Sequence, residues 1–265
     1  MLSGNTAISS DPYGLDFDGN SQSDIVWRHQ ATGQNVVWLM EGELGHQYRD
    51  YTALTNVGAG WDIKGVADFN QDGDPDILWR HQATGQNVVW HMGGNNNTTI
   101  ESWDRLTNVG AGWDIKGTAD FNQDGDPDIL WRHQATGQNV VWHMGGNNNT
   151  AIESWNRLTT VGGTWDIRGI SDFNQDGRPG IFWRNNTTGE NVIWHMQGAN
   201  NTQIGSHNFV TTVGLGWEPI LTGWSPSKLP EVAQTLTLSE LSSSIQTGST
   251  YDIRWADNLG GAVNI

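Results

Sequence analysis

The chain has 265 residues, of which 29 are acidic and only 13 are lysine or arginine, giving a formal net charge of −16 at neutral pH. This acidity argues against a nucleic-acid partner, because phosphates require a basic surface. Cysteine is absent, so no disulfide can support the fold. No apolar run reaches the roughly 18 residues of a membrane-spanning helix, and the first residues lack the basic and apolar segments of a secretory signal.

Sixteen tryptophans and 34 glycines, with few helix signals, predict an all-β protein of short strands and tight turns. The N-terminal segment 1–15 matches the rest of the chain poorly, and we expect it to add a strand that helps to close the domain. A 52-residue passage then recurs four times, and its second and third copies differ at only eight positions. Such a period is typical of stacked or radial units. The copies occupy 16–67, 68–119, 120–171 and 172–223, within a repeat region that spans 16–224.

Each copy predicts four strands. In the second copy they lie at 76–82, 87–92, 98–106 and 113–119, with turn residues at 83–86, 93–97 and 108–112. Ile77, Leu78 and Trp79 are apolar on consecutive positions, which predicts a strand covered on both faces. A blade between two others in a β-propeller meets this requirement; a solenoid is the alternative. We predict a β-propeller with four four-stranded blades in this chain, either closed as a small ring or completed by further sequence or by a second chain as a homo-oligomer.

The repeat stops after Trp224. Residues 225–233 contain two prolines and predict a linker. Residues 234–265 predict strands at 234–241 and 250–255, and the stretch from Gly248 onward resembles the opening of immunoglobulin-like modules of secreted and wall-anchored proteins. The segment is too short for the seven strands of such a sandwich, so we expect an incomplete β-sandwich-like module.

Every copy opens with a nine-residue acidic loop, which in the second copy reads Asp-Phe-Asn-Gln-Asp-Gly-Asp-Pro-Asp. Oxygen-bearing side chains at alternate positions converge when the backbone curls, and a glycine at the sixth position permits the bend. An acid at the ninth position closes the shell of six to eight oxygens that Ca²⁺ takes. The predicted ligands are Asp68, Asn70, Asp72, Asp74 (through its carbonyl) and Asp76 in the second copy, and Asp120, Asn122, Asp124, Asp126 (through its carbonyl) and Asp128 in the third.

The first and fourth loops depart from this pattern. Ser21 replaces the glycine of the first loop, which predicts a strained bend, and Gly180 and Arg178 of the fourth loop predict weak or no calcium binding. The alternative for all four loops is a tight Asx-turn that needs no ion; against it, the clustered carboxylates would repel one another unless neutralised. The ligands expected here are Asp16, Asp18, Asn20, Gln22 and Asp24 in the first loop, and weakly Asp172, Asn174 and Asp176 in the fourth.

Set between the last strand of one blade and the first of the next, this loop resembles those of the FG-GAP and VCBS repeat families. It is similar to the loops of integrin α-subunit propellers and of some fungal propeller lectins. The resemblance covers residues 16–224. It implies a β-propeller, structural calcium, a location outside the cell or at its surface, and a role in adhesion or ligand binding, but it does not single out a ligand.

Two histidine positions and one arginine position also recur every 52 residues. Histidines in a ring around an axis would bind a transition metal, but we favour hydrogen bonds to the neighbouring blade. We expect the arginines to pair with acids of the fourth strands, because a guanidinium between packed blades needs a partner. The histidines are His29, His81 and His133, and His91, His143 and His195; the arginines are Arg28, Arg80, Arg132 and Arg184; the acids are Asp62, Asp114 and Asp166.

Three positions are tryptophan in every copy, beginning with Trp27, Trp38 and Trp61, and we expect them to pack between blades. A fourth position is tryptophan in only two copies and is tyrosine or histidine in the others. Such variation indicates a side chain that contacts a ligand rather than one that packs in the core. An indole face can stack on a pyranose ring; structural packing is the alternative. The candidate ligand-binding residues at this position are Trp103, Trp155 and Tyr51.

The sequence contains no nucleophile elbow, no His-Glu-x-x-His motif and no phosphate-binding glycine loop. Near-identical units also argue against an enzyme, because a catalytic site needs different residues at one point. We therefore expect a calcium-binding extracellular β-propeller that acts as a binding or adhesion module for glycans or cell-surface proteins. The alternatives are an accessory or catalytic propeller of a polysaccharide-degrading enzyme, and a structural spacer array.

Overall fold

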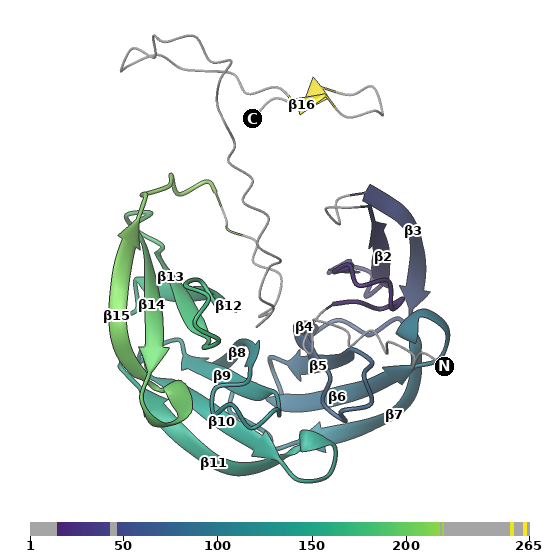
Figure 1. The fold of residues 1–265 in the computed structure, drawn as a ribbon, viewed down its shortest axis with the longest axis horizontal. Helices are drawn as coiled ribbons and strands as arrows, with labels where there is room; N and C mark the ends of the chain where they lie inside the picture. The colour runs from purple at the N-terminus through teal and green to yellow at the C-terminus, as the bar shows by residue number, and fades with distance from the viewer. Residues whose placement is uncertain (1–14, 43–46, 218, 220–254, 257–261, 264–265) are drawn as a thin grey trace, which may run out of the picture. The chain divides into compact units, whose positions relative to one another are not determined.

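The computed structural model describes residues 15–42, 47–217, 219, 255–256 and 262–263. The chain divides into two compact units, 1–228 and 229–265. In the first unit, three sheets have four strands and another has three described strands (Figure 1), which confirms the predicted all-β propeller. Blade one holds β1 (Ile25–Arg28), β2 (Asn35–Glu41) and β3 (Gln47–Leu54); blade two β4 (Trp61–Ala67), β5 (Asp76–His81), β6 (Gln86–Gly93) and β7 (Thr99–Leu106); blade three β8 (Trp113–Ala119), β9 (Asp128–His133), β10 (Asn139–Gly145) and β11 (Ala151–Leu158); blade four β12 (Trp165–Ser171), β13 (Gly180–Asn185), β14 (Asn191–Gln197) and β15 (Gln203–Val210).

The strands of the second copy, β5 to β8, lie within two residues of their predicted bounds, because tight turns separate them where the sequence indicates turns. Gly85, in the turn between β5 and β6, has φ +72°, and a Cβ placed there would lie 2.0 Å from the carbonyl oxygen of Val109. The predicted polar loop contains a 3₁₀ turn in which Asn96 has φ 55°. These turns are η1 (Asn95–Asn97), η2 (Asn147–Asn149) and η3 (Ala199–Asn201).

Neighbouring blades meet along their innermost strands. Figure 1 shows β4, β8 and β12 toward the centre and β7, β11 and β15 at the periphery. Lys64 on β4 pairs with Asp114 on β8 at 3.0 Å, and Lys116 on β8 pairs with Asp166 on β12 at 2.9 Å. The blades are therefore linked near the centre by ion pairs as well as by apolar packing.

The blades are out of phase with the sequence repeat, and this corrects the predicted placement of the acidic loops. The last strand of each copy pairs with the first strand of the next copy, as Ala67 pairs with Asp76. The loop between these two residues therefore lies within one sheet and not between two blades. Blade two consequently consists of β4 from the first copy and β5–β7 from the second.

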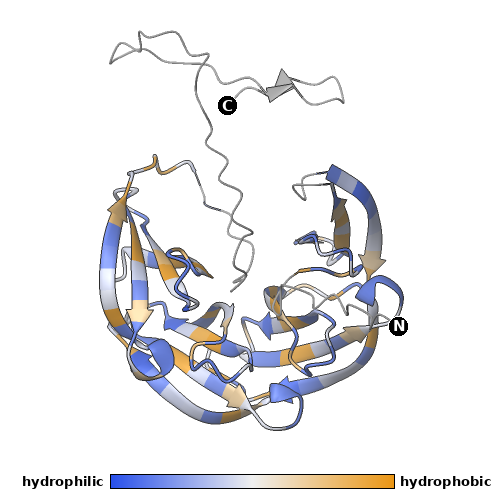
Figure 2. Ribbon diagram, viewed as in Figure 1, coloured by the Kyte–Doolittle hydropathy of each residue, from blue (hydrophilic) through white to orange (hydrophobic). Residues whose placement is uncertain are grey.

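Tryptophans and arginines fill the space between blades. Trp79, Trp131 and Trp183 are each 1% exposed, as predicted for packing between blades. The guanidinium of Arg80 lies over the Trp131 ring of the next blade, 5.1 Å from its centroid. The outer strands carry many hydrophilic residues, as Figure 2 shows, and only isolated positions on them, such as Leu106, are buried.

Several predictions fall on other parts of the chain. The N-terminal closing strand and the linker 225–233 lie outside the described residues. Of the C-terminal module, the structure describes β16 (Trp255–Ala256) and β17 (Ala262–Val263), which pair antiparallel. Among the helices in the described ranges, none is long and apolar enough to cross a membrane.

Candidate functional site

The acidic loops are closed by hydrogen bonds from their own backbone. In the second copy, the Asp68 carboxylate accepts the backbone N–H groups of Asp72 at 3.1 Å and Gly73 at 2.9 Å. The Asn70 side-chain oxygen accepts the Asp72 N–H at 3.2 Å, and the Asp72 carboxylate accepts the Asp74 N–H at 2.9 Å. Side chains at positions one, three and five are thus turned inward by Asx-turns, which gathers their oxygens on the concave side of the loop.

Two positions of each loop adopt left-handed backbone, and in every loop one of these two residues is glycine and the other is not. In the second copy these are Gln71 with φ 59° and Gly73 with φ 95°. The first loop exchanges the two residue types, with Gly19 at φ 70° and Ser21 at φ 66°. Ser21 thus adopts the left-handed backbone that a strained bend implies, but the first loop is not exceptional, because every loop carries one non-glycine residue in this region.

The aspartate at the ninth position is a buried part of the sheet. Asp76 is 0% exposed, and its carboxylate accepts the backbone N–H groups of Phe69 at 3.0 Å and Met92 at 2.8 Å. Its Oδ2 also lies 2.9 Å from Nδ1 of His91, whose Nε2 lies 3.0 Å from Asp104. The histidine bond thus stays within one blade, contrary to the expectation that it reaches the neighbouring blade.

The fourth copy lacks this carboxylate, and the consequence is visible in its histidine. Gly180 stands at the ninth position, and Nδ1 of the corresponding His195 is buried with no hydrogen-bond partner among the described residues. A Cβ at Gly180 would lie 3.0 Å from the Phe173 ring and from the Trp194 carbonyl oxygen. Phe173 and the Trp194 carbonyl oxygen therefore occupy the space that an aspartate side chain at this position would need.

Burial raises the pKa of several loop carboxyls. Burial raises the pKa of Asp68 to about 6, opposed by the hydrogen bond from Gly73 N–H and reinforced by the charge of Asp72. Burial likewise raises the pKa of Asp24 to about 6, against the hydrogen bonds from Met40 and Phe17. The pKa values of Asp16, Asp74, Asp120, Asp126 and Asp128 are also raised, chiefly by burial.

The loops differ in how they neutralise their acids. In the first loop, carboxylate oxygens of Asp16, Asp18 and Asp24 lie within 4.8 Å of one another, and Arg49 pairs with Asp18. In the second loop the third position is an amide, and Asn70 donates to the Asp72 carboxylate at 2.7 Å. Position five is exposed in the second, third and fourth loops, whereas position seven is half-buried in all four. The other predicted ligands make hydrogen bonds within their own loops: Asn122 and Asn174 at position three, Asn20, Asp124 and Asp176 at position five, and Gln22 at position seven.

The recurring arginines are satisfied differently from the prediction. Arg80 donates to the backbone carbonyls of Val109 and Gly110 at 3.1 Å and of Trp113 at 2.8 Å. Asp114, the acid expected to pair with it, is held by Lys64 and Lys116 instead. Arg132 of blade three does reach an expected acid, because its Nε lies 3.6 Å from Asp166 of blade four.

The other histidine position also stays within its own blade. His81 packs edge-on against Trp61 of the adjacent strand, with ring centroids 5.2 Å apart, and its Nδ1 accepts the Thr84 N–H at 3.3 Å. In the part of the chain that the structure describes, the three acids of the first loop are the group of histidines, cysteines or acids within reach of one metal ion. Among the described residues, the recurring histidines therefore do not come together as a metal site around an axis.

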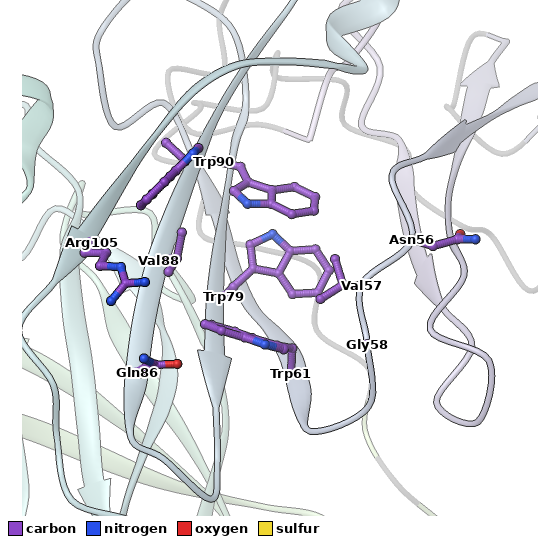
Figure 3. Close-up of a pocket in the computed structure, with 10 residues that line it drawn as sticks. Asn56, Val57, Gly58, Trp61, Trp79, Gln86, Val88, Trp90 and Arg105 are labelled. Atoms are coloured by element: carbon purple, nitrogen blue, oxygen red, sulfur yellow. The ribbon is translucent and has the colours of Figure 1, made fainter.

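A pocket of about 350 Å³ lies where the connection from blade one to blade two crosses the face of blade two. In Figure 3, Trp79 and Trp90 lie next to each other, with Trp61 beyond Trp79 and the connecting segment with Val57 opposite. The rings of Trp79 and Trp90 are 4.8 Å apart and tilted by 53°. Trp103 also lines the pocket, and the polar lining residues are Asn56, Gln86 and Arg105.

A pocket of about 300 Å³ occurs at the corresponding place on blade four. Its walls repeat the first pocket 104 residues later, with Trp165, Trp183 and Trp194 in the places of Trp61, Trp79 and Trp90. His207 and Phe209 replace Trp103 and Arg105, so this copy is more apolar. The pocket is therefore a property of the repeat, and its outer wall varies between copies.

The candidate ligand-binding aromatics are exposed on the outer strands. Trp103 and Trp155 are each 56% exposed and Tyr51 is 57% exposed. The Arg105 guanidinium lies 5.9 Å from the Trp103 ring centroid, and Arg157 lies 6.0 Å from that of Trp155. Of the three aromatics, Trp103 borders a described pocket, and sequence reasoning missed that Trp61, Trp79 and Trp90 form its inner walls.

The fold and the loops agree with the comparison with known families. The model of the FG-GAP-like repeat matches three overlapping segments, residues 16–79, 68–131 and 120–183. Each match begins at an acidic loop and ends at the buried tryptophan that follows the next loop. No curated protein matches the chain significantly. Since the three segments together cover more than half of the chain, the protein belongs to the FG-GAP-like repeat family.

Proposed function

We propose that this propeller is a binding module that holds carbohydrate in the pockets between its blades. The observation that carries the proposal is the pocket on blade two, in which four tryptophans stand beside an arginine and two amides. Ligand pockets are mostly apolar and use a few polar groups to fix orientation. A sugar ring offers an apolar C–H face for an indole and hydroxyl groups for amides and guanidinium, so it suits this lining better than a purely apolar ligand does.

The exposed rim of the pocket supports reversible binding of a surface glycan. Trp103 presents over half of its surface to solvent, and Arg105 and Gln86 lie beside it. The inner walls are built from tryptophans that also pack the blades, so the pocket is already formed without a ligand. We propose that the chain acts outside the cell or at its surface, in adhesion to glycans, and that it has no catalytic activity of its own.

The experiment is a glycan array followed by calorimetric titration of the sugars that bind. Trp103→Ala should weaken binding by about 5- to 150-fold, because a stacked aromatic ring contributes on the order of 1–3 kcal/mol. Tyr48→Ala is the matched control: Tyr48 is 51% exposed on β3 and lies outside both described pockets. Equal affinities for the wild type and Trp103→Ala would refute the site.

We further propose that the acidic loops hold calcium as a structural ion. The donor set is wholly oxygen, and in the first loop three carboxylates approach within 4.8 Å, as a hard cation requires. In the second loop, Asp68, Asn70, Asp72 and the carbonyl of Asp74 would hold the ion. Bound calcium would screen the mutual repulsion of these groups and so lower the cost of gathering them in the folded state.

Calcium should therefore raise the melting temperature, because only the folded loop gathers the ligands. The measurement compares samples in millimolar calcium and in excess chelator. Asp72→Asn, which keeps an acceptor for the Asp74 N–H, should reduce the difference without lowering the melting temperature in chelator. Anomalous scattering should place calcium in the second and third loops first and partially in the first. The fourth loop should stay empty, because Arg178 puts a positive charge in it. Identical melting curves with calcium and with chelator would contradict the proposal.

A further inference from the structure

The contact between one blade and the next occurs three times in this chain with the same chemistry. Arg28, Arg80 and Arg132 lie over a tryptophan ring of the following blade at 5.3, 5.1 and 5.1 Å. A valine of each connecting segment (Val57, Val109 and Val161) packs against the hydrophobic cluster that contains the same tryptophan. The following blade thus always presents a tryptophan pair, and the preceding blade presents an arginine and aliphatic side chains.

Blade one presents the tryptophan pair without a described blade to cover it. Trp27 occupies the position of Trp79 but is 47% exposed, whereas Trp79 is 1% exposed. Trp38 is 38% exposed, and its ring lies 4.7 Å from that of Trp27, the same pairing as Trp79 with Trp90. The expectation that Trp27 and Trp38 pack between blades is therefore wrong for this copy, although their positions are suited to it.

Blade four presents the complementary surface, also without a described blade to cover it. Val210 is 39% exposed, whereas Leu106 at the corresponding position of blade two is 4% exposed. Val213 and Trp217 are 39% and 55% exposed, and their counterparts in the earlier copies are half-buried. Arg184 is buried and donates to the carbonyls of Val213 and Gly214, as its counterparts do, so the open part of this face is aliphatic and aromatic.

We propose that a second copy of this chain binds here, with its blade-one face packed against the blade-four face of the first copy. The contact would continue the blade-to-blade interface already formed three times within the chain, valine on tryptophan. Exposed apolar patches of this kind on a protein are typical of interaction sites. Because two different surfaces meet, the association is head-to-tail, and it either closes into a ring or extends as a chain.

The test is the mass of the full-length chain in solution, by light scattering and sedimentation over about 1–100 µM. We expect the wild type to associate. Trp27→Lys and Val213→Lys should each raise the dissociation constant about 30-fold or more, as substitutions of central interface residues do. An equimolar mixture of the two variants should associate again, because each retains the surface that the other has lost. Trp155→Lys, which changes an equally exposed tryptophan on the outer strand of blade three, should associate like the wild type.

Circular dichroism checks that each variant keeps its fold. A wild type that is monomeric throughout this range would overturn the proposal, whether the two faces lie open or are covered by other residues of the same chain. Association that survives both single substitutions would place the contact elsewhere. Failure of the mixture to associate, with both variants folded, would exclude a head-to-tail contact.

Discussion

Replacing Trp131 by alanine tests whether the tryptophans between blades hold the propeller together. Trp131 is 1% exposed, its ring lies 4.7 Å from Trp142, and Arg80 covers its outer face. A buried indole removes roughly 200 Å² from water, which at about 25 cal/mol per Å² is worth about 5 kcal/mol. Its Nε1 is buried without a partner in the described structure, and losing that unsatisfied group returns about 1 kcal/mol.

We therefore expect Trp131→Ala to lower the free energy of unfolding by about 4 kcal/mol, within the range seen for large aromatic residues. In a domain of this size the melting temperature would fall by about 8–16 °C. Trp131→Phe should cost far less, because it keeps most of the buried area and removes the unsatisfied N–H. Trp103→Ala should cost less than about 2 kcal/mol, because 56% of Trp103 is already exposed.

Urea unfolding followed by circular dichroism would decide the matter, with midpoints compared at unchanged slope. Equal losses for Trp131→Ala and Trp103→Ala would refute the reasoning, since they would show that burial between blades does not set the cost. A Trp131→Phe variant as unstable as Trp131→Ala would also refute it, because the loss would then come from the indole N–H and not from apolar area.

Three further predictions use the repeat as its own control. His91→Leu should lower the free energy of unfolding by about 2 kcal/mol, because it leaves the buried Asp76 without one of its hydrogen-bond donors. His195→Leu, in the copy that lacks this acid, should change the free energy of unfolding by no more than about 0.5 kcal/mol. Equal losses in urea unfolding would contradict this. Burial raises the pKa of Asp114, but Lys64 and Lys116 beside it outweigh burial and leave the pKa lowered. The ionised Asp114 therefore stabilises the fold above its unfolded pKa of about 3.9, and this stabilisation is lost as the pH falls through the lower pKa of the folded state. Asp114→Asn should therefore cost on the order of 1 kcal/mol at pH 7 and flatten the loss of stability below about pH 4. A melting temperature that falls with acid as steeply as in the wild type would contradict this. Gly85→Ala should cost about 2 kcal/mol or more, because its Cβ would meet a carbonyl oxygen at 2.0 Å, and a melting temperature equal to that of the wild type would show that the turn can relax.

Local patterns predict the strands and turns of this protein well. Ile77, Leu78 and Trp79 are all fully buried, as their consecutive apolar character predicts. The left-handed backbone of Gly73 and of Asn96 lies where loop chemistry indicates it. These features depend on a few neighbouring residues, so a single sequence contains the information that determines them.

Features that depend on distant parts of the chain are not visible in the same way. Trp27 and Trp79 stand in similar local sequences, yet one is half exposed and the other buried, because only the second has a described blade against it. Arg80 binds backbone carbonyls, which every residue offers and no sequence pattern marks. The pairing of Ala67 with Asp76 across the acidic loop was likewise visible only in the structure, because the sequence does not show with which neighbour in the chain a strand pairs.

The phase difference between blade and repeat bears on how such an array can change its length. Blades two, three and four each take their innermost strand from the copy before, so removing or inserting a copy among them changes two blades. A deletion or duplication of 52 residues nevertheless rejoins equivalent strands wherever it begins, because the lost and gained strands are of the same kind. The eight differences between the second and third copies show how little such a copy has diverged. Gene rearrangement could therefore add or remove whole blades at any breakpoint within the repeats. Every sheet would keep its full number of strands.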